Sequence, residues 1–187
     1  AEVGTRAEIG RSTAGGAEVT GMSAAFDGES ALVAWTDRGP GDVDRIVARL
    51  LGVDGSARDD GEPRPVSPSA GAQYRPSVTA LTSRRGFAVA WEAMGDPEDD
   101  DPSGLGIRMI VLDEQVRPLF ANPVCDAVDL QVNREHEGNQ LRPALTTLVG
   151  GAVLVAWTGQ DISDTGVRTT ALRPEDLFPP EGGTTSP

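Results

Sequence analysis

The tripeptide Val-Ala-Trp occurs three times in this chain, and each copy ends a short apolar run. The runs cover residues 31–35, 87–91 and 153–157, and they contain the only three tryptophans, Trp35, Trp91 and Trp157. A repeated unit explains this spacing better than chance, and a sequence repeat constrains the architecture before any single residue does. We therefore expect a repeat protein in which these tryptophans belong to the structural core.

Similar segments flank each apolar run, so the repeated unit is longer than the tripeptide. A strand-like segment and a glycine-containing turn precede the run, and an acidic loop and a third strand follow it. Glycine at a hairpin tip supplies the positive φ that tight turns require. A weaker fourth segment follows at residues 64–67 and 130–133. The pattern predicts four-stranded antiparallel units at about 19–67 and 74–133, and a third unit at 141–172 that lacks its fourth strand.

A further strand-like segment lies near the N-terminus, at residues 5–10. The residues Ala7-Glu8-Ile9-Gly10, followed by small residues, match the fourth segments of the first two units. A chain that begins with the last strand of a unit has the permuted layout that closes β-propellers, because this strand covers an open sheet edge. We expect a single all-β, β-propeller-like domain over residues 1–173, in which the N-terminal strand completes the last unit. A Pro/Gly-rich tail at 174–187 would follow it.

The chemistry of the expected strands agrees with an all-β fold. The runs that end in tryptophan are apolar at every position, as expected for strands buried on both faces. The third strands mix Arg49, Arg108 and Thr169 with apolar residues, which suits positions nearer a solvated rim. No window shows a sustained helical period, and Gly and Pro interrupt the chain too often for long helices.

The repeated unit resembles a tandem repeat of large secreted bacterial proteins, many of which also carry hemolysin-type calcium-binding repeats. The matching residues are Gly138, Gln140, Pro143, Leu148, Gly151, Val155 and Trp157 in the third unit, Gln73, Pro76, Leu81, Gly86, Val89 and Trp91 in the second, and Gly28, Val33 and Trp35 in the first. The resemblance implies propeller-like β structure and a bacterial cell-surface, envelope or secreted setting. It implies no established catalytic residues.

The number of units makes assembly an expectation of the sequence. Closed propellers typically have four or more blades, and this chain supplies three. We therefore expect a partial propeller that is closed either by homo-oligomerisation, for example two copies in a six-bladed ring, or by a subunit of another protein.

The composition excludes several classes of partner. The chain of 187 residues carries 29 acidic and 16 basic residues, a net charge of −13, which argues against nucleic acid or anionic membrane as a partner. No apolar stretch approaches the roughly 20 residues that span a bilayer, so we expect no membrane insertion. The chain opens without methionine or a signal-peptide apolar region, so we expect a mature or partial chain.

The densest acidic run is the only candidate for a metal site. Asp96, Asp99, Asp100 and Asp101 lie in the loop after Trp91, and clustered carboxylates are ligands for Ca²⁺. The run lacks the alternating Asp pattern of a strong calcium loop, so a solvated loop is the alternative. Weak, optional calcium binding predicts a mild rise in melting temperature. Equal melting temperatures in millimolar calcium and in chelator would leave only the solubilising role.

Other candidate chemistry is sparse. The single histidine, His136, lies between two glutamates, and the single cysteine, Cys125, can form no disulfide within the chain. One histidine and one cysteine make a zinc site improbable. We expect a non-catalytic module, without a required cofactor, that mediates protein–protein interaction. The alternatives are a lectin that binds glycans between blades and a glycoside hydrolase that uses loop carboxylates, although no spacing selects a pair.

Overall fold

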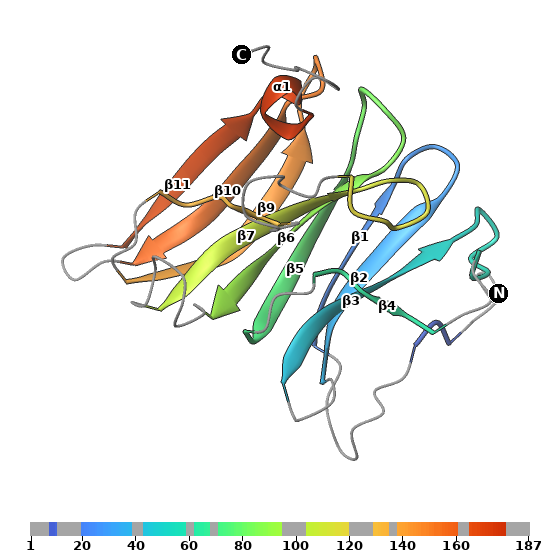
Figure 1. Cartoon of the computed structure of the whole chain (residues 1–187), viewed down its shortest axis with the longest axis horizontal. Helices are drawn as coiled ribbons and strands as arrows, with labels where there is room; N and C mark the ends of the chain where they lie inside the picture. The colour runs from blue at the N-terminus through green and yellow to red at the C-terminus, as the bar shows by residue number, and fades with distance from the viewer. Residues whose placement is uncertain are drawn as a thin grey trace, which may run out of the picture.

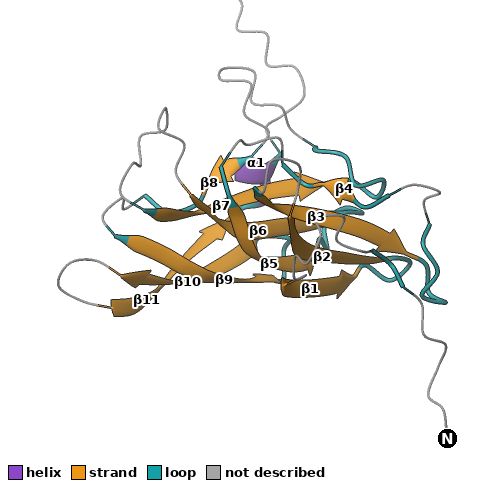
Figure 2. Cartoon of the chain, turned by 90° about the horizontal axis from the view of Figure 1, so that it is seen from below, coloured by secondary structure: helices purple, strands orange, loops and turns teal. Residues whose placement is uncertain are grey.

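The computed structural model describes most of the chain and is built almost wholly from antiparallel strands (Figure 2). The described residues are 8–10, 20–38, 43–58, 62–67, 71–94, 104–119, 129–134, 138–160 and 165–178. The prediction of an all-β chain is confirmed.

The strands form three separate sheets that follow one another along the chain (Figure 1). The first sheet contains β1 (Thr20–Phe26), β2 (Ala31–Arg38), β3 (Asp44–Leu51) and β4 (Arg64–Pro65). The second contains β5 (Gln73–Ala80), β6 (Phe87–Met94), β7 (Leu105–Leu112) and β8 (Leu130–Gln131). The third contains β9 (Asn139–Thr147), β10 (Val153–Gln160) and β11 (Thr165–Leu172). Each sheet is a meander in which neighbours in sequence are neighbours in space, and no sheet closes on itself.

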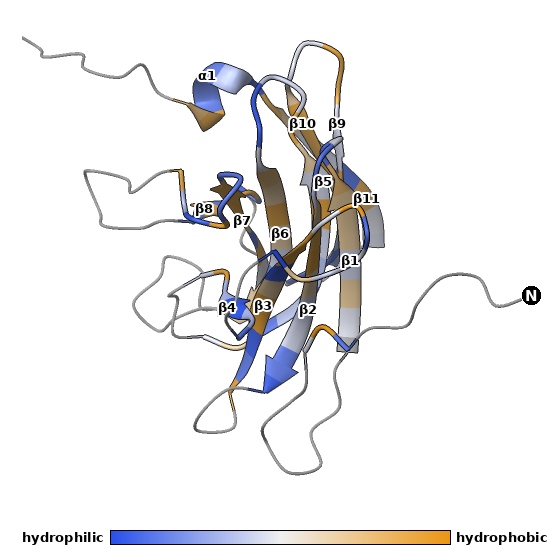
Figure 3. Ribbon diagram, turned by 90° about the vertical axis from the view of Figure 1, so that its right-hand side faces the viewer, coloured by the Kyte–Doolittle hydropathy of each residue, from blue (hydrophilic) through white to orange (hydrophobic). Residues whose placement is uncertain are grey.

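The first strands of the three sheets, β1, β5 and β9, lie next to one another. Figure 3 shows them on one side of the molecule, with the short strands β4 and β8 on the opposite side. Two apolar cores fill the spaces between successive sheets. One joins the first sheet to the second around Trp91 and Phe87, and the other joins the second to the third around Trp157 and Met109.

Only the middle sheet is buried on both faces. All but the last position of β6 is buried, whereas β2 and β10 have partly exposed residues between buried ones. The continuous burial expected of all three Trp-ending runs therefore occurs in the second sheet alone. The reason is that the first and third sheets each have only one neighbour.

The turns between the first two strands of each sheet fix the register of the hairpins. Asp27 Oδ1 accepts the backbone N–H groups of Glu29 and Ser30 at 2.9 and 2.8 Å, which is an Asx turn. Gly86 has a φ of +134°, and a Cβ there would clash with the carbonyl oxygen of Leu112. Only glycine suits this position, because β7 returns directly behind the turn.

The C-terminal segment begins differently from the expected tail. Residues Pro174–Leu177 form a helical turn, α1, with proline in its first turn. Leu177 is fully buried in the core between the second and third sheets. The packed core therefore includes a residue past the expected boundary at residue 173, because a leucine five residues after the end of β11 fills the end of that core.

Candidate interaction surface

The same backbone irregularity occurs in the first strand of every sheet. Opposite each tryptophan the strand register shifts, and the residue at the shift has a positive φ: Gly21 at 53°, Arg75 at 48° and Arg142 at 55°. Non-glycine residues in this region are strained, so two arginines here point to a specific requirement of the backbone. The bulge re-aims the local N–H group out of its own sheet.

The N–H groups at the bulges of the second and third sheets are bound by the preceding sheet. The Arg75 N–H donates to Thr36 Oγ1 at 3.2 Å, and the Arg142 N–H donates to Glu92 Oε1 at 2.7 Å. Thr36 and Glu92 are the residues directly after Trp35 and Trp91, so both junctions use the same position of the repeat. In the third sheet this position is Thr158.

A serine makes a second recurring contact at each junction. Ser23 Oγ accepts the Val78 N–H, and Ser77 Oγ accepts the Leu145 N–H, each at 3.1 Å. Ser23 and Ser77 hold equivalent register positions opposite Ala34 and Ala90. The two junctions therefore share one pattern, in which a serine and the residue after the tryptophan accept N–H groups of the following sheet.

Glu92 combines this junction with an ion pair to Arg75. Its side chain is fully buried, and its Oε2 lies 2.7 Å from Nη1 of Arg75. The two oxygens thus bind a guanidinium of their own sheet and a backbone N–H of the next. A carboxylate engaged on both oxygens acts here as a structural link between sheets.

The third sheet exposes the face that would form the next junction. We call this the open face, and it consists of the residues that alternate with the core residues of β10 and β11: Leu154, Ala156, Thr158, Val167, Thr169 and Ala171. Val167 is 80% exposed, whereas the equivalent residues Ile46 and Ile107 are 0% exposed. An apolar side chain therefore stands in solvent at a position that is buried in the other two sheets.

The edge of β11 is open as well, and a cavity lies beside it. The cavity has a volume of about 260 Å³ and is lined by Val132, Arg134, Trp157, Arg168, Thr169 and Thr170. In the first two sheets the third strand pairs with a short fourth strand, and in the third sheet the described residues supply none.

The N-terminal segment does not complete the third sheet within the chain, so completion of the third sheet by this segment from a second copy stays a prediction. Residues 8–10 form no strand and lie against the first sheet, where the Ile9 carbonyl accepts a hydrogen bond from Arg49 Nη1 at 2.7 Å. A Cβ at Gly10 would overlap the ring of Trp35. The segment packs on the first sheet because it covers the face of that sheet that has no neighbour. Residues 5–7 lie outside the described residues.

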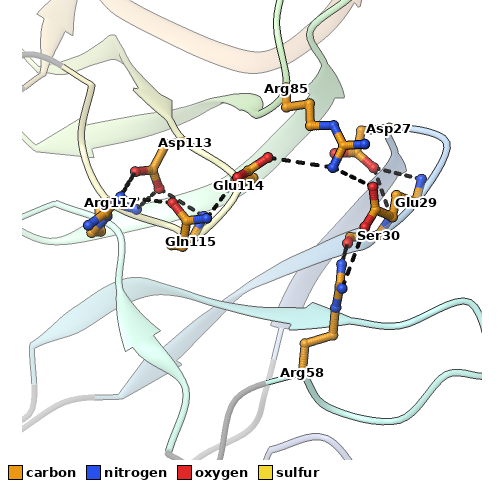
Figure 4. Close-up of polar contacts among 9 residues, drawn as sticks. All are labelled: Asp27, Glu29, Ser30, Arg58, Arg85, Asp113, Glu114, Gln115 and Arg117. Atoms are coloured by element: carbon orange, nitrogen blue, oxygen red, sulfur yellow. Dashed lines mark hydrogen bonds and ion pairs between the residues drawn. The ribbon is translucent and has the colours of Figure 1, made fainter.

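A network of charged residues joins the turns of the first two sheets (Figure 4). Arg85 contacts Glu29 and lies 3.7 Å from Glu114, and Arg58 binds both Glu29 and Ser30. These side chains are largely exposed, and such pairs contribute little to stability. The adjacent Arg84 turns to the other side, 4.2 Å from the ring centroid of Phe178.

Asp113 in the same network closes the turn after β7. Burial raises the pKa of the Asp113 carboxyl, but hydrogen bonds from Arg117 and Gln115 outweigh burial, so its pKa lies below the ordinary value. The Arg117 N–H and the Gln115 N–H donate to Oδ1 at 2.9 and 2.8 Å. This turn holds Val116, at a φ of +60°, against the core between the first two sheets.

Of the candidate residues named from the sequence, some lie in the described part of the structure and others do not. The three tryptophans are buried, and Trp157 donates its indole N–H to Gln140 Oε1 at 2.8 Å. Each is at most 7% exposed, so none offers an open ring to a sugar from solvent, and Trp157 borders the cavity beside β11. The acidic run with Asp96, Asp99, Asp100 and Asp101, together with Cys125 and His136, lies outside the described residues. Calcium binding there stays a prediction.

Comparison of the sequence with family models and with curated proteins gives no significant match. The resemblance to a secreted bacterial repeat stays a prediction as well. In the described part of the chain, no helix has the length and apolar character needed to cross a membrane. The repeated junction and the open face are thus the features on which a function can be argued.

Proposed function

We propose that this chain is a non-catalytic, β-propeller-type assembly module whose open face binds a further sheet of the same kind. The observation that carries the proposal is the exposure of Val167, 80%, where the equivalent Ile46 and Ile107 are fully buried. A monomer gains nothing from an apolar open face, whereas burial of such a face is the main source of association free energy.

Two further observations support an assembly role. The contacts at the junctions between sheets repeat with the same polarity, so a neighbour could dock on the third sheet without any new type of interface. Among the described residues, the buried carboxylates Glu92 and Asp129 each bind an arginine and a second group, which suits structural links. The resemblance of the repeat to secreted bacterial proteins favours an exported location.

Substitution of Val167 tests this proposal. Val167→Asp places a charge on the open face, and burying that charge in an interface is unfavourable. We expect self-association to weaken at least about tenfold, which corresponds to about 1.4 kcal/mol. Sedimentation velocity of the purified chain over a range of concentrations measures the association constant.

Val53→Asp is the matched control, because Val53 is 79% exposed and lies in the turn after β3, away from the open face. It should leave association unchanged, and both variants should keep the melting temperature of the unsubstituted chain. A chain that stays a single-copy species at all concentrations, whatever stands at position 167, would overturn the assembly function.

A further inference from the structure

We propose that two copies of the chain join head to tail, each copy placing its residues 8–10 beside β11 of the other. The proposal rests on the assembly function above and names its partner as a second copy. The two identical junctions would close a ring of six sheets. Five observations lead to it: the missing strand, the cavity, the position of the N-terminal segment, the polar groups of the terminal faces and the number of sheets.

The fourth segments show what the third sheet lacks. The Val66 N–H, directly after β4, donates to the carbonyl oxygen of Ile46 at 2.9 Å. The Val132 N–H, directly after β8, donates to the carbonyl oxygen of Ile107 at 2.8 Å. Ile46 and Ile107 pair with the residue after the tryptophan, as Val167 does in the third sheet. The Val167 carbonyl is therefore the expected acceptor for a fourth segment.

The cavity beside Trp157 lies along this same edge. Arg168 and Thr169, which line it, hold the register positions of Val47 and Ala48, and those two residues pair with β4. In the first sheet Pro63, the residue before β4, approaches Gly10 next to Trp35. The first sheet thus has a fourth segment close to its tryptophan, and the third sheet has a cavity there.

A fourth segment makes two sets of contacts, one with its own sheet and one with the tryptophan of the next sheet, and residues 8–10 already make the second set. Val66 bonds to its own sheet and also packs in the core that contains Trp91 of the next sheet. Val132 does the same with Trp157. Residues 8–10 pack on Trp35 of the first sheet, but the described residues contain no preceding sheet to which they could bond. The third sheet of a second copy supplies it, with Ile9 N–H opposite the Val167 carbonyl.

The terminal faces also carry matching polar groups. Thr158 holds the position of Thr36, whose hydroxyl accepts a bulge N–H from the next sheet. The corresponding bulge residue of the first sheet is Gly21, so the Gly21 N–H of one copy would bind Thr158 of the other. Ala144 replaces the serine found at positions 23 and 77, so the junction between copies lacks the second hydrogen bond. We therefore expect it to be weaker than the junctions within a chain.

The number of sheets selects two copies. Closed propellers have about four to eight blades, and six is the only multiple of three in that range. A two-fold axis relates the two junctions, so each copy uses both of its terminal faces and no edge is left open.

Disulfide trapping tests the junction. Arg168 holds the position of Val47 and Arg108, which pair with Pro65 and Gln131, the residues directly before Val66 and Val132. Glu8 directly precedes Ile9 in the same way, so we expect Glu8 opposite Arg168. Opposed residues on antiparallel strands have the Cα separation of a disulfide. In a Cys125→Ser background, Glu8→Cys combined with Arg168→Cys should give mainly covalent dimer on mild oxidation. Mixing the two single-cysteine variants should give the same dimer with one disulfide.

The controls separate this arrangement from others. Glu8→Cys with Thr165→Cys, three residues along the same strand, should give little covalent dimer. A dimer of the Glu8→Cys variant alone would show head-to-head contact and overturn the proposal, as would a disulfide formed within one chain. If the chain associates through Val167 and yet no pair traps, the head-to-tail junction is wrong and the assembly function stands. If the chain does not associate at all, both are wrong.

Discussion

Replacing Trp91 with alanine is expected to lower the free energy of unfolding by about 3–5 kcal/mol. Trp91 is fully buried and belongs to the core that joins the first two sheets, with Leu32, Ile46 and Phe87. The middle sheet is packed on both sides, so the surrounding strands have little freedom to collapse into the space. Urea unfolding followed by far-ultraviolet circular dichroism measures the loss without relying on tryptophan fluorescence.

Trp91→Phe is the matched variant for this prediction. The indole N–H of Trp91 meets no acceptor among the described residues, so phenylalanine removes volume and no hydrogen bond. We expect it to cost less than half of what alanine costs. A loss below about 1 kcal/mol for Trp91→Ala would place Trp91 among ordinary surface positions and contradict the packed junction.

The second large effect is expected at Glu92. Glu92→Ala removes the acceptor of the Arg142 N–H and the partner of Arg75, and it should lower the free energy of unfolding by about 2–3 kcal/mol. The loss stays below that of a fully buried ion pair because the Arg75 side chain is 60% exposed and regains water. Denaturant unfolding of both proteins at neutral pH gives the difference.

Glu92→Thr is the control suggested by the repeat itself. Thr36 accepts the equivalent N–H in the first sheet with its hydroxyl, so threonine at position 92 keeps this acceptor. The Thr variant should be more stable than the Ala variant. Equal stabilities would mean that the hydrogen bond across the junction contributes nothing and that only the ion pair matters.

The sequence predicted the strands of this fold better than their relation to one another. The Val-Ala-Trp runs and the glycine turns located β2, β6 and β10, because short apolar runs between turn signals have few other solutions. The link through Glu92 was missed. The polar residue after each tryptophan, Thr36, Glu92 and Thr158, could have indicated this link. A polar side chain at the end of a buried strand needs a hydrogen-bond partner.

Other features could not be read from the sequence because they depend on distant segments. The left-handed conformation of Arg75 and Arg142 runs against the preference of arginine, and it is set by acceptors in the preceding sheet. Leu177 looked like part of a tail because proline and acidic residues surround it, and its burial depends on the space between two sheets. The cavity beside β11 likewise lies between residues far apart in the sequence, Val132 and Arg134 on one side and Trp157 with β11 on the other.

The sameness of the two junctions has a consequence for how such a gene could change. Stability in an array of this kind is roughly a sum of units and nearest-neighbour contacts, so no contact depends on how many units the array has. Duplication or loss of one sheet-length segment would preserve the pattern of the remaining junctions, because both junctions use the same positions of the repeat. In a ring built from identical copies of such a chain, the number of sheets would be a whole multiple of the number of sheets in one chain. Chains of different lengths could reach the same ring with different numbers of subunits.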